Sequence, residues 1–336
     1  MGQMQRIGVV GGGAWGTALA TVARRAGRDV TLWAREAEVV DAIVRHHENA
    51  PFLPGVKLDR AIRATDNLMT AVDGADAIVL ATPAQHSRAV AEEIAPLVTP
   101  EMPVVICAKG IEAGTLMLMS EVMAEALPGR PAAVLSGPTF AGEVARGLPT
   151  AVTLAAPTRV LGEDLLAALG TPRFRTYWSP DLVGAQIGGA VKNVLAIACG
   201  IVAGRGLGDS ARAALITRGM AEMIRLGAAK GAHAETLMGL SGMGDLVLTC
   251  TSAQSRNTTL GMALAKGETL DDILGSRRSV AEGVSSAESV VGLARRFGIE
   301  MPICEAVHDV LYAGVAIDDA IDALLSRPYK PEPPHA

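Results

Sequence analysis

Residues 6–33 read RIGVVGGGAWGTALATVARRAGRDVTLW, and the fold follows from them. A short apolar run at residues 6–10 is typical of a buried strand, GGGAWG at residues 11–16 comes next, and residues 17–25 have the spacing of a helix. Gly27 ends that helix, and residues 29–33 supply a second apolar strand. This order of strand, glycine-rich turn, helix and strand within about 30 residues predicts a dinucleotide-binding unit.

The glycines of this G-x-G-x-x-G pattern fit a pyrophosphate-binding turn. Gly11 permits a tight turn, Gly13 lets the backbone approach the pyrophosphate, and Gly16 lets the helix pack on the strand. The helix N-terminus adds unpaired N–H groups and the positive end of the helix dipole. After the second strand, Arg35 would accommodate a 2′-phosphate, and Glu36 would bind a free 2′-hydroxyl. Because Arg35 comes first, we expect NADPH to be preferred and NADH to be possible; the structural alternative is a solvated charge at a strand end.

Further strand patterns recur along the first half of the chain. They lie at residues 76–82, 104–109, 132–136, 151–155 and 174–177. The first three are nearly continuous apolar runs and alternate with helical stretches, which is typical of a parallel sheet covered on both faces. The last two are expected to extend that sheet.

The length of 336 residues favours two domains. The strand pattern fades at about residue 181, and apolar residues then recur at helical spacing. Hydrophobic residues make up 49% of the chain and aromatic residues 3%, and the 37 glycines suit close-packed helices and phosphate loops. The predicted class is α/β, with a Rossmann-type NAD(P)-binding domain at residues 1–180, an all-helical substrate domain at residues 181–326 and a disordered tail at residues 327–336.

Composition excludes several other classes. The net charge of −5, with dispersed lysines and arginines, argues against a nucleic-acid partner. Mean hydropathy is +0.31, but Lys192 and Asn193 interrupt the most apolar long run, which predicts no membrane span because a span requires ~18 uninterrupted apolar residues. The N-terminus has no signal-peptide pattern, so a cytoplasmic protein is expected. Four widely spaced cysteines in apolar segments predict reduced core thiols and no metal site.

Polar residues follow two of the predicted strands, at the sheet edge where ligands bind in such folds. Lys109 lies where a strand end would direct a cation into the cleft, and Gly110 allows a tight turn after it. SGPT at residues 136–139 offers hydroxyls and backbone N–H groups before a helix predicted at residues 139–144. These groups either hold a substrate oxygen or cap that helix.

GGAVKNV at residues 188–194 places one lysine inside a long apolar helix. An unpaired ammonium is costly there, so Lys192 needs a partner or a function. It extends its amine to the helix surface, meets a structural carboxylate, or takes part in catalysis. Asp245, in the glycine-flanked turn SGMGDL at residues 241–246, is the nearest plausible counter-charge.

Arg256 and Asn257 come just before a helix predicted at residues 259–264. A guanidinium beside a helix N-terminus is a good receiver for a phosphate, although polar breaks of this kind are usually ordinary loops. The pattern therefore suggests a phosphorylated substrate.

Over residues 5–325 these motifs closely resemble those of bacterial NAD(P)-dependent glycerol-3-phosphate dehydrogenases. The most specific are GGAVKN at residues 188–193, GMGDL at 242–246 and SRN at 255–257. GGGAWG at 11–16, Asn49, FLPG at 52–55, AKG at 108–110 and SGPTFA at 136–141 agree with them. Phe52 departs from the family, in which tyrosine is usual before Leu-Pro-Gly. The resemblance implies a helical domain like that of 6-phosphogluconate dehydrogenase, with the active site between the two domains.

The resemblance also implies site residues. Lys192 would be the proton donor and acceptor, and Lys109 would contact both cofactor and substrate; these two are the expected catalytic residues. The other expected substrate positions are Gly137, Thr139, Asp245, Ser255, Arg256 and Asn257. The expected cofactor positions are Gly11, Gly13, Ala14, Trp15, Gly16, Arg35, Lys109, Ala141, Arg256, Val280 and Glu282.

The implied reaction is reversible hydride transfer between NAD(P)H and dihydroxyacetone phosphate, giving sn-glycerol 3-phosphate for the glycerophospholipid backbone. Two other interpretations stay open. One is a β-hydroxyacid dehydrogenase that acts on a carboxylate, and the other is a non-catalytic NADPH sensor in which Lys192 is only structural. The apolar helical domain favours a homodimer.

Overall fold

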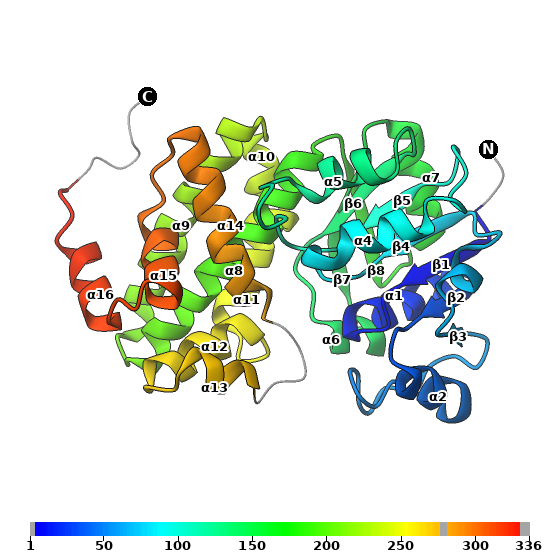
Figure 1. The fold of residues 1–336 in the computed structure, drawn as a ribbon, viewed down its shortest axis with the longest axis horizontal. Coiled ribbons are helices and arrows are strands. Elements are labelled where there is room, and N and C mark those ends of the chain that lie inside the picture. The colour runs from blue at the N-terminus through cyan, green and yellow to red at the C-terminus, as the bar shows by residue number, and fades with distance from the viewer. Residues whose placement is uncertain (1–3, 276–280, 330–336) are drawn as a thin grey trace.

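The computed structural model describes residues 4–275 and 281–329, in which a sheet domain is followed by a helical domain (Figure 1). The strands of these residues form one eight-stranded sheet in the order β3-β2-β1-β4-β5-β6-β7-β8. They are β1 (Arg6–Val10), β2 (Asp29–Trp33), β3 (Arg63–Thr65), β4 (Ala77–Leu80), β5 (Val104–Ile106), β6 (Ala132–Ser136), β7 (Thr150–Ala155) and β8 (Phe174–Ser179). The predicted Rossmann-type α/β class is confirmed.

Two features of the sheet differ from the expectation. Strand β3 was not predicted, because it has three residues and only one of them is apolar. Strands β1 to β6 pair in parallel, but β7 pairs with β6 antiparallel and β8 pairs with β7 in parallel. The last two strands therefore extend the sheet as predicted but run against the first six, and an apolar run carries no signal of strand direction.

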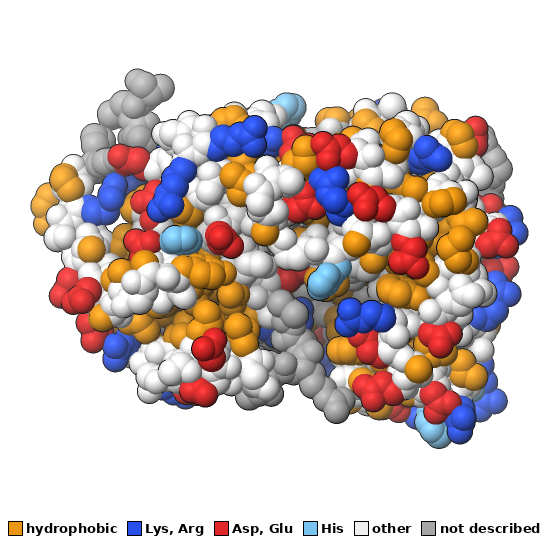
Figure 2. Space-filling view, viewed as in Figure 1, with side chains coloured by type: hydrophobic (Ala, Val, Ile, Leu, Met, Phe, Trp, Pro, Cys, Tyr) orange, Lys and Arg blue, Asp and Glu red, His pale blue; other side chains and the backbone are white. Residues whose placement is uncertain are grey.

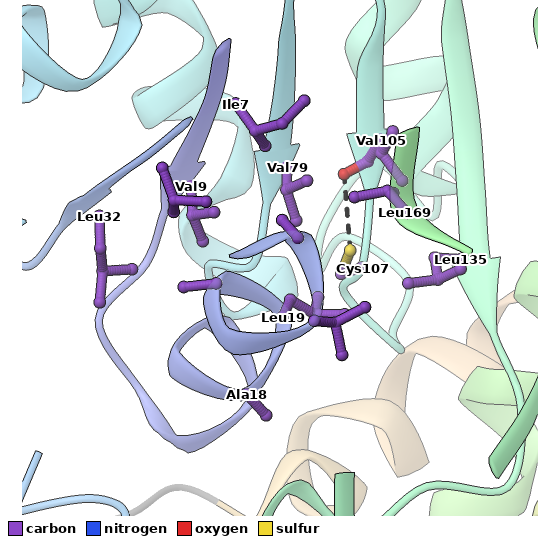
Figure 3. Packing of buried hydrophobic residues seen from close by; sticks show 14 of the residues in the cluster. Ile7, Val9, Ala18, Leu19, Leu32, Val79, Val105, Cys107, Leu135 and Leu169 are labelled. Atoms are coloured by element: carbon purple, nitrogen blue, oxygen red, sulfur yellow. Dashed lines mark hydrogen bonds between the residues drawn. The ribbon is translucent and has the colours of Figure 1, made fainter. Parts of the chain in front are cut away.

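Helices cover both faces of the sheet. They are α1 (Ala14–Arg25), α2 (Ala37–His46), α3 (Leu68–Val72), α4 (Ala84–Ile94), α5 (Met119–Ala126), α6 (Ala141–Arg146) and α7 (Arg159–Leu169). Val9, Val79 and Val105 pack with Leu19 of α1 on one face (Figure 3). Ile78 and its neighbours on the central strands pack against α3, α4 and α5 on the other face. Burial on both faces explains why these strands are apolar throughout.

From Leu182 onward the described residues form helices. They are α8 (Leu182–Gly204), α9 (Gly208–Lys230), α10 (Ala234–Leu237), the π-helical turn η1 (Leu240–Gly244), α11 (Asp245–Thr251), α12 (Arg256–Ala265), α13 (Leu270–Gly275), α14 (Glu282–Phe297), α15 (Pro302–Tyr312) and α16 (Ile317–Leu325). Helix α8 lies at the centre and packs against α9, α11, α12, α14 and α15 (Figure 1). Most of the tail expected at residues 327–336 lies outside the described residues.

Helix α8 has apolar or small side chains on every face because it is buried all round, and Gln186, Lys192 and Asn193 are its polar exceptions. By length and composition alone it could cross a bilayer, but 89% of its most apolar 18-residue window is buried inside this protein. Asp181 begins the helix by accepting a hydrogen bond from Gly184 N at 2.7 Å. Gly200 meets α12 backbone to backbone, since a Cβ there would overlap the carbonyl oxygen of Thr258. This close packing fixes the C-terminal part of α8 against α12.

Candidate active site

The turn between β1 and α1 depends on glycine at three places. Gly11 has a φ of +128°, and a Cβ there would lie 2.7 Å from the carbonyl oxygen of Ala81. A Cβ on Gly16 would overlap the carbonyl oxygen of Gly11, so only glycine lets α1 begin against the turn. Gly12, for which no role was predicted, packs in the same way against Ala34. Asn49 braces the turn from outside by donating to Gly12 O at 2.7 Å.

The same turn leaves room for a ligand. Although Gly12 and Gly16 are closely packed, a Cβ on Gly13 would meet no atom of the described chain within 4 Å. Gly13 is the N-cap of α1, and no side chain of the described residues caps that helix. Nearby, Trp15 Nε1 is buried and has no hydrogen-bond partner in residues 4–275 and 281–329. An open glycine, an uncapped helix end and an unpaired donor fit the pyrophosphate of a dinucleotide.

The two candidates for contact with the ribose form an ion pair with each other. Arg35 Nη2 lies 3.0 Å from Glu36 Oε1, and the Arg35 side chain is 76% exposed. The pair holds the Glu36 carboxylate against Arg35 while most of the guanidinium stays accessible. An exposed pair of this kind is weak and easily rearranged, so Arg35 remains available to a 2′-phosphate.

Asp245 lies between two lysines from different domains. It is the first residue of α11 and its side chain is completely buried. Lys109, in the connection after β5, donates from Nζ to Asp245 Oδ2 at 2.7 Å, and Lys192, in the middle of α8, donates from Nζ to Oδ1 at 2.9 Å. The predicted pairing of Lys192 with Asp245 is confirmed, and the carboxylate joins the sheet domain to the helical domain.

Glycines on α8 bring these groups together. A Cβ on Gly188 would lie 2.5 Å from Ser241 O, so this glycine lets the turn η1, which leads into Asp245, approach α8. A Cβ on Gly189 would lie 3.3 Å from Cγ of Lys109. The glycine pair that opens the GGAVKN motif therefore makes room for the turn that leads into Asp245 and for the side chain of Lys109. Turns of the π type are often found at functional sites.

The surroundings of Lys192 suit proton exchange. Burial lowers the pKa of Lys192, and the positive charge of Lys109 lowers it too, while Asp245 acts in the opposite direction. A lysine with a lowered pKa gives up and regains its proton more readily near neutral pH. Lys192 Nζ also donates to Thr249 Oγ1 at 2.9 Å. Thr249 was not predicted, although it stands four residues after Asp245 and so on the same face of α11.

A chain of side-chain amides continues from Lys109 across the helical domain. Asn193 Nδ2 donates to the backbone oxygen of Lys109 at 3.0 Å, and Asn257 Nδ2 donates to Asn193 Oδ1 at 2.9 Å. Gly283 N, at the start of α14, donates to Asn257 Oδ1 at 3.0 Å. Asn257 therefore uses its Oδ1 and one N–H of Nδ2 within the protein, which leaves the second N–H for a ligand. Asn193, for which no role was predicted, fixes the backbone of Lys109.

The SRN motif begins helix α12 and does not merely precede it. Ser255 is the N-cap, and its Oγ accepts from Thr258 N at 3.1 Å, so the helix starts three residues earlier than predicted. Arg256 is the first residue of the helix. Burial raises the pKa of Glu282, and the positive charge of Arg256, followed by those of the two lysines, opposes that rise. Glu282 thus lies among the cations of the site.

The SGPT segment contributes a carbonyl group to the lysine site. Gly137 O accepts from Lys109 Nζ at 2.9 Å and from Thr139 Oγ1 at 3.3 Å. Helix α6 begins at Ala141, and its N-cap is Phe140, so the alternative that SGPT caps a helix is wrong. Ser136 Oγ is buried with no partner in the described part of the chain, which leaves it available to a bound ligand.

Comparison with known proteins agrees with this site. A family model described as NAD-dependent glycerol-3-phosphate dehydrogenase N-terminus matches residues 6–161, and one described as the C-terminus of the same enzymes matches residues 181–322. The chain belongs to this family. It is 60% identical over 328 residues to the glycerol-3-phosphate dehydrogenase [NAD(P)+] of Parvibaculum lavamentivorans, covering 98% of each chain. It is also 60% identical to the protein of that name from Rhodospirillum rubrum, covering 98% of this chain and 94% of the relative.

A solved structure supports the same assignment. The glycerol-3-phosphate dehydrogenase of Coxiella burnetii superposes with a TM-score of 0.93 at 40% identity, over 96% of this chain and 99% of the other. Of the residues that the family resemblance suggested, Lys109, Lys192, Asp245 and Gly137 come together in the structure. Ala14 and Ala141 are the first residues of α1 and α6, which pack against each other, and Val280 lies outside the described residues.

Proposed function

We propose that the protein catalyses the reversible NAD(P)H-dependent reduction of dihydroxyacetone phosphate to sn-glycerol 3-phosphate. The observation that carries the proposal is the buried group of Lys109, Asp245 and Lys192 where the two domains meet. Relatives of 60% identity that are named glycerol-3-phosphate dehydrogenase [NAD(P)+] support the same substrate.

In this proposal each residue of the site has a separate role in the reaction. The bound cofactor supplies the hydride that reaches C2 of the substrate. Lys192 gives its proton to the C2 oxygen as negative charge develops there, and removes it in the reverse direction. Lys109 stabilises the developing charge, since an ammonium in a water-poor site is far more effective than in bulk solvent. Asp245 holds both ammonium groups in place, and Thr249 fixes the direction of Lys192 Nζ.

The remaining predicted residues bind substrate and cofactor in this proposal. Substrate contacts come from Gly137, Thr139, Ser255, Arg256 and Asn257, with Arg256 at the N-terminus of α12 as the main phosphate ligand. The cofactor contacts are Gly11, Gly13, Ala14, Trp15, Gly16, Arg35, Lys109, Ala141, Arg256, Val280 and Glu282. Arg35 favours NADPH over NADH because its side chain is 76% exposed and a guanidinium suits a 2′-phosphate.

The proposal includes a setting for the enzyme. Its product supplies the glycerophospholipid backbone, and it acts in the cytoplasm as a homodimer, with residues 1–180 as the cofactor domain and residues 181–326 as the substrate domain. Free, buried cysteines support a reducing compartment. Hydrophobic side chains that gather on the helical domain around α15 and α12 support association with a second copy (Figure 2).

The direct test is NADPH oxidation, followed by absorbance, on adding dihydroxyacetone phosphate. Lys192→Ala should lower kcat by about 10² to 10⁴. Lys266→Ala is the control, because Lys266 is exposed at the C-terminal end of α12, the end opposite Arg256. Near-normal turnover in Lys192→Ala would reject the mechanism.

Two further measurements define the substrate. Arg256→Ala should mainly raise the KM for dihydroxyacetone phosphate, and an unchanged KM would move the phosphate to another site. Small 3-hydroxy acids should neither be oxidised nor compete with dihydroxyacetone phosphate. If they were the better substrates, the protein would be a hydroxyacid dehydrogenase instead.

A further inference from the structure

The connection between β5 and α5 belongs to the sheet domain but enters the core of the helical domain. Ile111 and Leu118 are completely buried in the cluster built around α8, and they face each other in an antiparallel β-bridge. Residues 111–118, which we call the clasp, form the blue-green loop beside α14 in Figure 1. The clasp is therefore shared between the two domains.

Helix α4 of the sheet domain holds the clasp from one side. Arg88 binds Glu112 through two parallel hydrogen bonds, Nε to Oε1 and Nη2 to Oε2, each of 2.9 Å. Gln85 donates to Ile111 O and accepts from Ala113 N, both at 2.9 Å. A two-bond pairing of guanidinium and carboxylate fixes orientation as well as distance. The base of the clasp is thus fixed to α4.

Leu116 attaches the other side of the clasp to the helical domain. Its φ is +60°, a left-handed conformation that is uncommon for a residue other than glycine. Its side chain lies on α14 at Gly292, where a Cβ would stand 3.0 Å from Leu116 Cδ2. A strained leucine and a glycine inside a helix are both locally unfavourable, and they meet at this one contact. Such a combination persists only where the surrounding structure requires it.

Lys109 lies two residues before the clasp. Its backbone oxygen is held by Asn193 of α8, and Gly110 beside it is pressed against α4, since a Cβ there would lie 2.8 Å from Ala84 Cβ. Its ammonium reaches both Gly137 O in the sheet domain and Asp245 in the helical domain. Ile111, the first residue of the clasp, follows Lys109 after two peptide bonds, so a displacement that reaches Ile111 also acts on Lys109.

We propose that the clasp is a positioning element of the active site, in which the contact of Leu116 with Gly292 sets the place of the Lys109 ammonium between Asp245 and Gly137. Leu116 and Gly292 are positioning residues, and neither touches Lys109. The inference rests on the proposed dehydrogenase function for its effect on rate. Its effect on Lys109 itself is independent of the substrate.

The test is a set of three variants of the full-length protein: Gly292→Val, Leu116→Ala and the double variant. Valine at position 292 needs the space of Leu116, so kcat should fall by about 10²-fold, the effect of misplacing a catalytic group by about 1 Å. NADPH binding, measured by fluorescence titration, should weaken in Gly292→Val and recover in the double variant, because Lys109 is one of the proposed cofactor contacts. Removing the Leu116 side chain in the double variant should restore most of kcat, and Leu116→Ala alone should lower it less than Gly292→Val.

The pH profile of kcat distinguishes a displaced Lys109 from a loss of folded protein. Three charged groups act on Lys192: Asp245 on α11, Glu282 on α14, and Lys109 in the connection after β5. Because Lys109 lowers the pKa of Lys192, displacing Lys109 should move the falling limb of the kcat profile for dihydroxyacetone phosphate reduction to higher pH. A purely structural clasp would reduce the amount of active protein without moving this limb.

A second readout needs no substrate. The Lys109 side chain is 14% exposed, so its acetylation by acetic anhydride, followed by mass spectrometry, should be slow in the wild type, faster in Gly292→Val and slow again in the double variant. Unchanged labelling of Lys109 and an unmoved pH limb in folded Gly292→Val would overturn the proposal. A wild-type protein inactive on dihydroxyacetone phosphate would overturn the proposed function alone, because the labelling would still decide the role of the clasp.

Discussion

Replacing Asp245 by asparagine tests the centre of the site most directly. The Asp245 carboxylate is completely buried and accepts from Lys109 at 2.7 Å and from Lys192 at 2.9 Å. Asparagine keeps one acceptor oxygen, but its NH₂ group faces the second ammonium. Charge-assisted hydrogen bonds contribute about 1.5–3 kcal/mol each, and removing one member of a buried ion pair costs about 3–5 kcal/mol. We expect the free energy of unfolding to fall by about 3 kcal/mol.

The same substitution changes the charge state of Lys192. Burial and the charge of Lys109 lower the pKa of Lys192, and Asp245 raises it. Without the carboxylate the pKa falls further, so Lys192 loses its proton at a lower pH than in the wild type. Reduction of dihydroxyacetone phosphate requires the proton, and its kcat should begin to decline at lower pH. Oxidation of glycerol 3-phosphate requires the free amine, and its rise with pH should also begin earlier.

The assay is kcat against pH in both directions, with stability measured by urea unfolding. Asp181→Asn is the matched control, because Asp181 is also buried and accepts backbone hydrogen bonds from Gly184 and His233 at the N-cap of α8, about three helical turns before Lys192. It should lower stability and leave both pH limbs in place. An Asp245→Asn profile that coincides with the wild type in both directions would refute the proton role of Lys192.

Three other substitutions test separate parts of the structure. Gly16→Ala would place a Cβ on Gly11 O, and overpacking of this kind costs about 1–3 kcal/mol. Since 1.4 kcal/mol is tenfold in Kd, NADPH affinity should fall by about 5- to 150-fold in a titration; unchanged affinity would contradict the packing argument. Arg35→Ala should raise the KM for NADPH by about tenfold and barely alter that for NADH, and equal changes would remove Arg35 from cofactor discrimination. Glu222→Ala leaves the buried N–H groups of Ile303 and Cys304 unpaired, so urea unfolding should show a loss of about 2 kcal/mol with kcat unchanged; wild-type stability would show that these donors find other partners.

The sequence predicted the first unit of the fold well because its signals are local. Glycine spacing determines the turn at residues 11–16, since each close approach excludes a Cβ for a reason that depends on nearby backbone. The apolar strands were also evident, because a strand covered on both faces must be apolar throughout. Strand β3 escaped detection because RAT has too little apolar character, and the reversed direction of β7 has no local signature.

The sequence predicted which residues form the candidate site better than it predicted the contacts between them. Lys192 stood out as a charge in an apolar helix and Asp245 as an acid in a glycine-flanked turn. Nothing local indicated that one carboxylate would serve two lysines 136 and 53 positions away. The role of Asn193 as a support for the backbone of Lys109 depends on how the domains dock. Thr249 could have been found from its spacing to Asp245, which places both on one face of α11.

The buried pairing also bears on why a lysine is present in α8 at all. Stability does not explain it, because replacing a buried ion pair by apolar side chains is often neutral or stabilising. Helix α8 is otherwise built for packing, with glycines that admit α12 and η1 at backbone distance. At Lys192 it departs from that rule and places an ammonium against a carboxylate, a hydroxyl and a second lysine. The carboxylate of Asp245 raises the pKa of Lys192, and the charge of Lys109 lowers it. These opposing effects suit an ammonium that must release and regain its proton in every turnover.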